Sequence, residues 1–142
     1  PEHKRGIKLK TIDEWISAGL IEYLGTTDDV RQFIHKADCV VLPSYREGAP
    51  RTLLEAASSS KPIVATDVPG CHHVVVHNYN GLLCKLKDAD DLAEKMKMMA
   101  HLDEPRLKEM GENGRKKVEQ EYSESVVIDK YLSAISNFKK AS

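Results

Sequence analysis

Two glutamates, Glu47 and Glu55, are the side chains of this sequence best suited to hold a ligand with neighbouring hydroxyl groups. A carboxylate accepts two hydrogen bonds from a vicinal diol such as that of ribose. Glu55 is expected early in a helix, where its side chain leans back toward the helix start, and Glu47 lies in the loop before that helix. The two carboxylates therefore suggest a site for a ligand that contains a sugar.

The start of the same helix offers a place for an anion. Pro50 in the first helical turn is expected to leave the amides of residues 51–53 free, at the positive end of the helix dipole. Gly48 allows backbone to approach a ligand without an intervening side chain, so a diphosphate would suit this turn. A structural interpretation stands beside this one: Glu55 compensates the dipole, or pairs with Arg51 four residues earlier.

The candidate residues fall in loops of a predicted parallel sheet. The predicted strands are the short apolar runs at 21–24, 39–42, 62–66 and 81–84. Their starts recur at roughly 20-residue intervals, the length of one strand–helix repeat. The polar loops that follow the first three strands are 25–29, 43–50 and 67–70. Because ligands of open parallel sheets bind beyond the carboxyl ends of the strands, these loops should converge on one binding edge.

Helices are predicted before, between and after the strands. Thr11 and Glu14 match a capping box, and Gly19 can take the left-handed conformation that ends a helix. Thr27 is the predicted cap of the next helix. The remaining predicted helices are 50–59, 91–101, 105–121 and 123–138. The pattern predicts half of a doubly wound α/β sheet, with helices on both faces and a C-terminal helical tail.

Composition and charge narrow the classes of function. The 142 residues suffice for one hydrophobic core, so a single domain, 1–142, is expected. With 21 basic and 22 acidic residues, the formal net charge of -1 gives no field to attract nucleic acid or an anionic membrane. The three cysteines form no C-x-x-C pair and are interpreted as reduced thiols. No apolar run reaches the roughly 18 residues of a membrane span, and no secretion signal is evident.

The residues around these loops resemble family 4 glycosyltransferases. The segment 37–56, ADCVVLPSYREGAPRTLLEA, resembles their donor-site segment, with Glu47 and Glu55 as its E-x7-E motif. The similarity continues through KPIVATDVPG at 61–70, NGLL at 80–83 and MGENGR at 110–115. It covers the chain from about residue 21 to residue 131. The resemblance implies the carboxy-terminal, nucleotide-sugar-binding half of a GT-B fold, in which two Rossmann-like domains face a cleft.

The resemblance also implies roles for individual residues. Glu55 would bind the ribose hydroxyls, and Glu47 is the candidate catalytic residue beside the donor sugar. The implied donor-binding set is Glu55, Gly48, Ala49, Arg51, Thr52, Gly25 and Thr26, the last two near the base. Family members retain the anomeric configuration and need no metal ion. The expected ligand is therefore the nucleotide-diphosphate sugar, with no cofactor and no metal.

The YREG sequence at 45–48 is most similar to the branch that builds capsule, exopolysaccharide and lipopolysaccharide in bacteria. This similarity implies a nucleotide sugar as donor, such as a UDP-sugar, and a glycan or lipid-linked acceptor. It also implies an amino-terminal acceptor domain, missing here together with a Gly-Arg…Lys-Gly element that holds the donor diphosphate. The expected location is cytoplasmic, at the inner face of the membrane in the parent enzyme. The chain alone is expected to have little or no transferase activity.

Other interpretations remain open at this point. A nucleotide-sugar epimerase would share the GT-B architecture, as would a glycan phosphorylase, although no segment resembles the pyridoxal-binding lysine site of the latter. A receiver-like interaction module would use Asp28 and Asp29 as its acidic pair and Asp67 as phosphoacceptor. The three histidines within residues 72–77 lack an acid or cysteine at ligand spacing, so a variable loop is preferred to a metal site.

Overall fold

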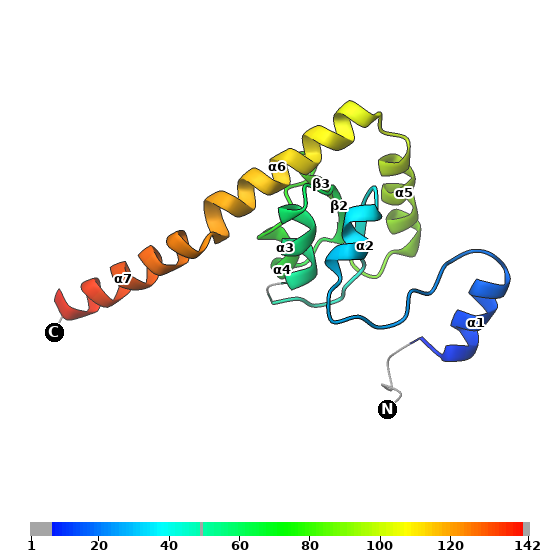
Figure 1. Cartoon of the computed structure of the whole chain (residues 1–142), viewed down its shortest axis with the longest axis horizontal. Helices are drawn as coiled ribbons and strands as arrows, with labels where there is room; N and C mark the ends of the chain where they lie inside the picture. Colours follow the sequence, from blue (N-terminus) through cyan, green and yellow to red (C-terminus); the bar gives the residue numbers. More distant parts are fainter. Residues whose placement is uncertain (1–6, 49, 141–142) are drawn as a thin grey trace.

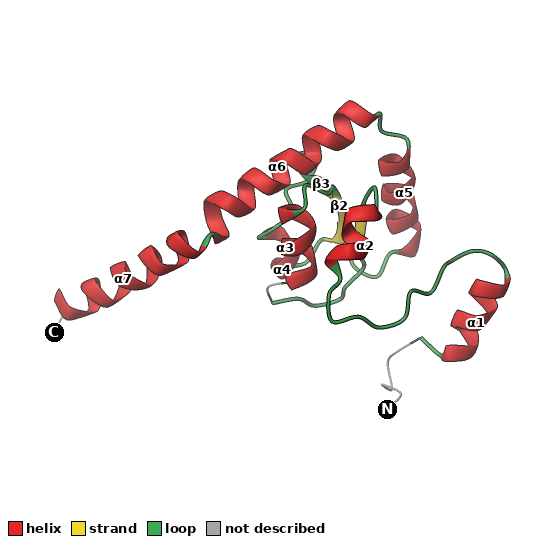
Figure 2. Ribbon diagram, in the orientation of Figure 1, coloured by secondary structure: helices red, strands yellow, loops and turns green. Residues whose placement is uncertain are grey.

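A computed structural model describes residues 7–48 and 50–140, with side chains as far as residue 133. Three parallel strands form a sheet that helices cover on both faces (Figure 2). The strands are β1 (Val40–Leu42), β2 (Ile63–Thr66) and β3 (Gly81–Cys84). The helices are α1 (Leu9–Ser17), α2 (Arg31–Lys36), α3 (Arg51–Ser58), α4 (Pro69–His72), α5 (Ala89–Ala100), α6 (Glu104–Tyr122) and α7 (Glu124–Lys140). The predicted α/β class is confirmed.

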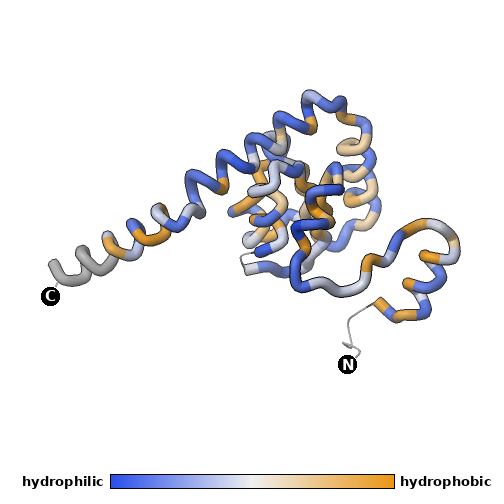
Figure 3. Tube along the Cα trace, in the orientation of Figure 1, coloured by the Kyte–Doolittle hydropathy of each residue, from blue (hydrophilic) through white to orange (hydrophobic). Residues whose placement is uncertain are grey.

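The sheet has the order β1-β2-β3, with Val41 beside Val64 and Val64 beside Leu82. Because successive strand residues point to opposite faces, β2 divides the core into two parts. Ile63 and Ala65 pack with α3 and α4 on one face, whereas Val64 packs on the other with residues of α5 and α6. All of β2 is buried, which explains the apolar run that precedes its last residue, Thr66. Figure 3 shows hydrophobic residues in the body around the sheet, and others along α1 and α7, outside this core.

Helix α6 crosses the end of α3 at very close range. A Cβ atom added to Gly111 would lie 2.7 Å from the carbonyl carbon of Ser60, and closer still to its oxygen. The two backbones therefore approach as closely as they do only because residue 111 has no side chain. Beyond this contact α6 continues into α7, which points away from the body of the molecule (Figure 1).

Helix α1 confirms the predicted helix but not its predicted start. It begins at Leu9 after Lys8, with no side-chain cap, so the capping box of Thr11 and Glu14 is wrong. Gly19 follows it with φ of 67°, the left-handed conformation predicted there. Figure 1 shows α1 at the end of a long loop, apart from the sheet.

The strand predicted at 21–24 is wrong. These residues form an irregular segment in which Ile21, Tyr23 and Leu24 are between 41% and 56% exposed. A strand needs a neighbour whose N–H and C=O groups pair with its own, and apolar character alone does not supply one. In the part of the chain that the structure describes, no segment pairs with the outer edge of β1, so the sheet has three strands rather than four.

Candidate functional site

An open, polar cavity of about 640 Å³ lies between the loop before α2 and the first turns of α3. The residues that line it are Thr27, Asp28, Asp29, Val30, Arg31, Arg51 and Glu55. Two of the predicted donor-binding residues, Arg51 and Glu55, therefore lie together in one cavity. The predicted residues Gly25 and Thr26 directly precede this lining along the chain but do not belong to it, and neither does Thr52.

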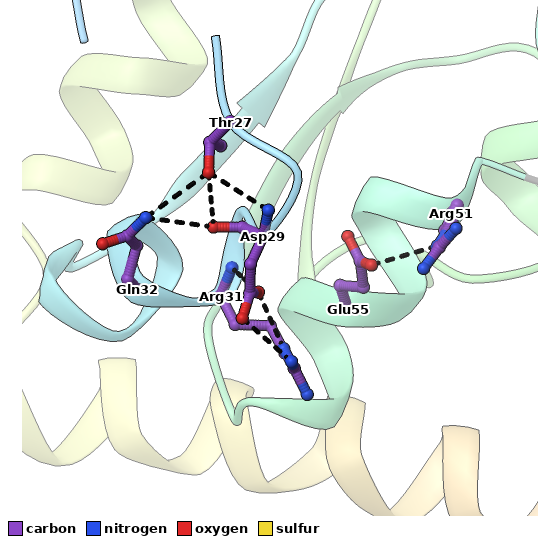
Figure 4. Close-up of polar contacts among 6 residues, drawn as sticks. All are labelled: Thr27, Asp29, Arg31, Gln32, Arg51 and Glu55. Atoms are coloured by element: carbon purple, nitrogen blue, oxygen red, sulfur yellow. Dashed lines mark hydrogen bonds and ion pairs between the residues drawn. The ribbon is translucent and has the colours of Figure 1, made fainter.

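Glu55 and Arg51 form an ion pair within the cavity, with 3.1 Å between Arg51 Nε and Glu55 Oε1 (Figure 4). The Arg51 side chain is 90% exposed and that of Glu55 24%. The pairing one turn apart that sequence analysis weighed against binding is thus present. Exposed pairs of this spacing contribute only about 0.3–0.5 kcal/mol, so a ligand hydroxyl can displace Arg51 at little cost.

The other wall of the cavity is a hydrogen-bonded turn formed by the predicted loop 25–29 and by Arg31, a residue that had not been predicted for the site. Arg31 donates from Nε and Nη2 to the two carboxylate oxygens of Asp29, at 2.8 and 2.9 Å. Asp29 N donates to Thr27 Oγ1 at 3.1 Å, and Gln32 Nε2 reaches the same oxygen at 3.4 Å (Figure 4). Because these contacts link neighbouring residues, the wall is held in place without a ligand.

Charge in this wall is balanced locally. The hydrogen bond from the Arg31 side chain, followed by that from its backbone amide, lowers the pKa of Asp29 from 3.8 to about 2. The pKa of Arg31 is raised, mainly by Asp29 and to a smaller degree by the negative charge of Glu55. Arg31 therefore faces the cavity as a fixed cation close to Glu55.

The start of α3 differs in detail from the prediction. Pro50 precedes the helix as its N-cap residue, and the Leu53 amide donates to the Pro50 carbonyl at 3.0 Å. The prediction of a free amide at Leu53 is therefore wrong. Among the described residues, the amides of Arg51 and Thr52 have no acceptor, as expected for a first helical turn.

Glu47 and Gly48 lie outside the polar cavity, and Ala49 lies outside the described residues. Their loop packs instead on α4, the short helix after β2. Burial, followed by the negative charge of Glu47, raises the pKa of the Cys71 thiol in α4 to about 11. The structure thus places the Glu47 backbone against α4 and the Glu55 side chain in the cavity, so the two glutamates of the motif do not share one cavity.

Two other cavities lie beside the sheet and suit a polar ligand less well. One, of about 320 Å³, lies between β1, α5 and α6, and it is lined largely by apolar residues such as Val41, Met99 and Leu107. The other, of about 310 Å³, lies beyond the carboxyl ends of the three strands, between Tyr45 and Lys87. Of these three cavities among the described residues, the one at Glu55 alone joins carboxylates, guanidinium groups and the start of a helix.

Histidines and acids do not converge as a metal site would require. Among residues 7–48 and 50–133, no three His, Cys, Asp or Glu side chains form a group that could hold a metal ion. His72 contacts the Asp67 carboxylate, and His77 Nδ1 accepts a hydrogen bond from the Leu83 amide at 2.9 Å. In the same described portion, no helix combines the length and apolarity needed to cross a bilayer.

The sequence matches the profile of the family described as "Glycosyl transferases group 1" over residues 10–117. It is 35% identical over 119 residues to N,N'-diacetylbacillosaminyl-diphospho-undecaprenol alpha-1,3-N-acetylgalactosaminyltransferase of Campylobacter jejuni, covering 84% of this chain and 31% of that protein. It is 30% identical over 114 residues to the capsular polysaccharide biosynthesis glycosyltransferase CapM of Staphylococcus aureus, covering 80% of this chain and 30% of that protein.

The fold also matches solved structures. HepE of Anabaena, in a crystal structure in complex with UDP, superposes with a TM-score of 0.80 at 22% sequence identity, over 90% of this chain and 36% of that chain. At this identity the match establishes the fold alone. The chain spans about a third of the length of the curated relatives that it matches.

Proposed function

Because the chain belongs to the glycosyl transferases group 1 family, we propose that it forms the nucleotide-sugar-binding part of a sugar-transferring enzyme. The donor is a sugar carried on a nucleoside diphosphate, and the nucleotide lies in the cavity between the loop before α2 and α3. The observation that carries this proposal is the position of Glu55 in that cavity, one turn along α3 from the free amides of Arg51 and Thr52.

The order of groups along α3 suggests how a nucleotide lies in the cavity. A diphosphate near the Arg51 and Thr52 amides meets N–H donors and the positive end of the helix dipole. A ribose one turn further along is within reach of Glu55, and the base then lies toward Thr27 and the residues before it. Arg51, released from Glu55 by the ribose, becomes available to the phosphate.

Transfer takes place beyond the diphosphate, toward the loop of Glu47. Glu47 is the proposed catalytic residue beside the donor sugar, and Gly48 and Ala49 contribute amides there by resemblance to the family. The helix amides and Arg51 stabilise the leaving diphosphate, so the proposal includes no metal ion. Retention of the anomeric configuration is part of the same proposal.

The acceptor is proposed to be a glycan or a lipid-linked precursor in capsule, exopolysaccharide or lipopolysaccharide synthesis. The C. jejuni relative is named for action on a diphospho-undecaprenol-linked acceptor, and the S. aureus relative for capsular polysaccharide biosynthesis. We place this chain as the carboxy-terminal domain of a GT-B enzyme, with a separate amino-terminal domain as the binder of acceptor. The proposed location is the cytoplasmic face of the membrane.

Isothermal calorimetry of this chain with UDP, GDP and their sugar conjugates tests the proposal. We expect saturable binding of one nucleotide series, and little or no sugar transfer in a product assay with the same chain. Binding of neither series at millimolar concentration would contradict the assignment of the cavity. Sugar transfer at the rate of a full-length relative would contradict the proposed division of labour between two domains.

A further inference from the structure

The backbone of the Glu47 loop rests directly on Gly70 in α4. A Cβ atom added to Gly70 would lie 2.6 Å from the carbonyl oxygen of Gly48 and closer still to that of Glu47. Both atoms belong to backbone, so neither can move without moving the loop itself. Gly70 is itself buried, which leaves α4 no room to withdraw. The position of residues 47–48 therefore depends on the position of α4.

A side-chain contact joins the two ends of the α4 turn. His72, the last residue of the helix, contacts through Nε2 the carboxylate of Asp67, which directly follows β2. Both side chains are about half exposed, so neither is required to fill the core. Asp67 is fixed on its other side, because its amide donates to the Cys84 carbonyl at 2.7 Å. The contact thus anchors α4 to the sheet at the carboxyl ends of β2 and β3.

We propose that Gly70 and the Asp67–His72 pair are positioning residues, which hold α4 so that it sets the place of Glu47 and Gly48 for the donor sugar. This inference rests on the proposed function for the role of Glu47. A short series of contacts connects the pair to the site. The Asp67–His72 pair fixes α4 to the sheet, and Gly70 of α4 packs directly against the backbone of the loop that contains Glu47. The nucleotide end of the site, at Thr27 and Glu55, takes no part in this series of contacts.

The first test uses the ligand-free chain and therefore does not depend on the function. Backbone amide NMR spectra of Gly70→Ala and His72→Ala should show shifts at Glu47 and Gly48 and none at residues 27–31. Gly114→Ala is the matched control for Gly70, since a Cβ there meets nothing closer than 3.5 Å. His73→Ala is the control for His72, and His72→Gln, which keeps a donor for Asp67, should restore the native shifts.

The second test separates a positioning role from a merely structural one. Calorimetry with UDP-glucose, UDP-N-acetylglucosamine and UDP-N-acetylgalactosamine identifies the donor that this chain binds best. For that donor His72→Ala should weaken binding about tenfold, equivalent to one hydrogen bond, while UDP itself binds as before. Thermal unfolding of each variant checks that the fold is retained, and His72→Ala carries the test if Gly70→Ala does not fold.

The outcomes distinguish this inference from the proposed function. Unchanged Glu47 and Gly48 shifts in the folded variants overturn the positioning role, whether or not the chain binds nucleotide. Equal losses for UDP and the UDP-sugar also overturn it, because they indicate general damage to the site. If no nucleotide binds the unmodified chain, the proposed function fails, and the ligand-free shifts still decide whether α4 positions the loop.

Discussion

Glu55 pairs with Arg51 in the structure and binds the ribose of the nucleotide in the proposed function. Its carboxylate binds Arg51 at 3.1 Å in the absence of ligand, and the same oxygens are to accept the ribose hydroxyls. The two uses are compatible because an exposed pair one turn apart is weak, whereas hydrogen bonds between neutral hydroxyls and a carboxylate are worth about 1.5–3 kcal/mol. The pair therefore holds the carboxylate in the cavity until the nucleotide arrives.

Replacing Glu55 with glutamine should weaken UDP binding roughly ten- to a hundredfold, because the charge-assisted hydrogen bonds to ribose are lost. Calorimetry measures the change. Glu119→Gln is a matched control, since Glu119 forms the same kind of ion pair with Arg115, at 2.8 Å, on the surface of α6. If both variants bound UDP as tightly as the unmodified chain, Glu55 would not be part of the nucleotide site.

Arg31 should control the titration of Asp29. Arg31→Ala is expected to raise the pKa of Asp29 from about 2 back toward 3.8, because the hydrogen bonds from Arg31 cause the shift. A carboxyl group whose pKa is lower in the folded than in the unfolded chain stabilises the folded state at pH values above the unfolded pKa. This stabilisation is lost as the pH falls from about 4 to about 2. Carboxyl-carbon NMR during an acid titration measures it, with Arg115→Ala as control. An unchanged Asp29 titration in Arg31→Ala would show that the pair does not form in solution.

Some of these residues can be predicted from the sequence, because the interactions that place them join residues close together along the chain. The spacing of Arg51 and Glu55 predicts their pairing, because residues four apart share a helix face. Arg31 was not predicted. It reaches the cavity because the loop before α2 folds against α3, and the spacing of residues along the sequence does not reveal a contact between distant segments. A signal was available in Thr27 and Asp29, whose side chains favour a turn at a helix start.

At the scale of elements, the apolar runs predicted β1, β2 and β3 nearly to the residue, and the three last helices within a few residues. A buried parallel strand can be recognised from its own sequence, because both of its faces are covered and most of its residues are apolar. The error at 21–24 has the opposite origin: pairing depends on a neighbouring strand, which the run itself does not encode. Gly111 and Gly114 lie within α6, as the predicted helix at 105–121 requires, and both are buried.

The two glycines of α6 should respond oppositely to alanine. Gly111→Ala forces a side chain against the Ser60 backbone, and overpacking of this kind costs about 1–3 kcal/mol, more than the roughly 1 kcal/mol that alanine adds in helix propensity. Gly114→Ala meets Asn80 and Ala57 at 3.5–3.6 Å, an ordinary contact, and should be neutral or slightly stabilising. Urea denaturation measures both. Equal free energies of unfolding for the two variants would contradict the close packing of α6 on α3.

At the scale of the whole molecule, the body around the three-stranded sheet carries two loops, one lining the cavity at Glu55 and one resting on α4. One loop carries Thr27 to Arg31, and the other carries Glu47 and Gly48. The chain belongs to the glycosyl transferases group 1 family and covers only about a third of the length of its relatives. In our account this third of the enzyme binds the donor, and bond formation requires the complete enzyme.

Amide-resolved NMR of this chain during a UDP titration tests the central claim most directly. We expect shifts confined to residues 25–31 and 51–55, with the largest at the Arg51 and Thr52 amides, and their loss in Glu55→Ala. Shifts centred on α6 or α7, or no shifts with UDP or GDP at millimolar concentration, would contradict a nucleotide site between the loop before α2 and α3.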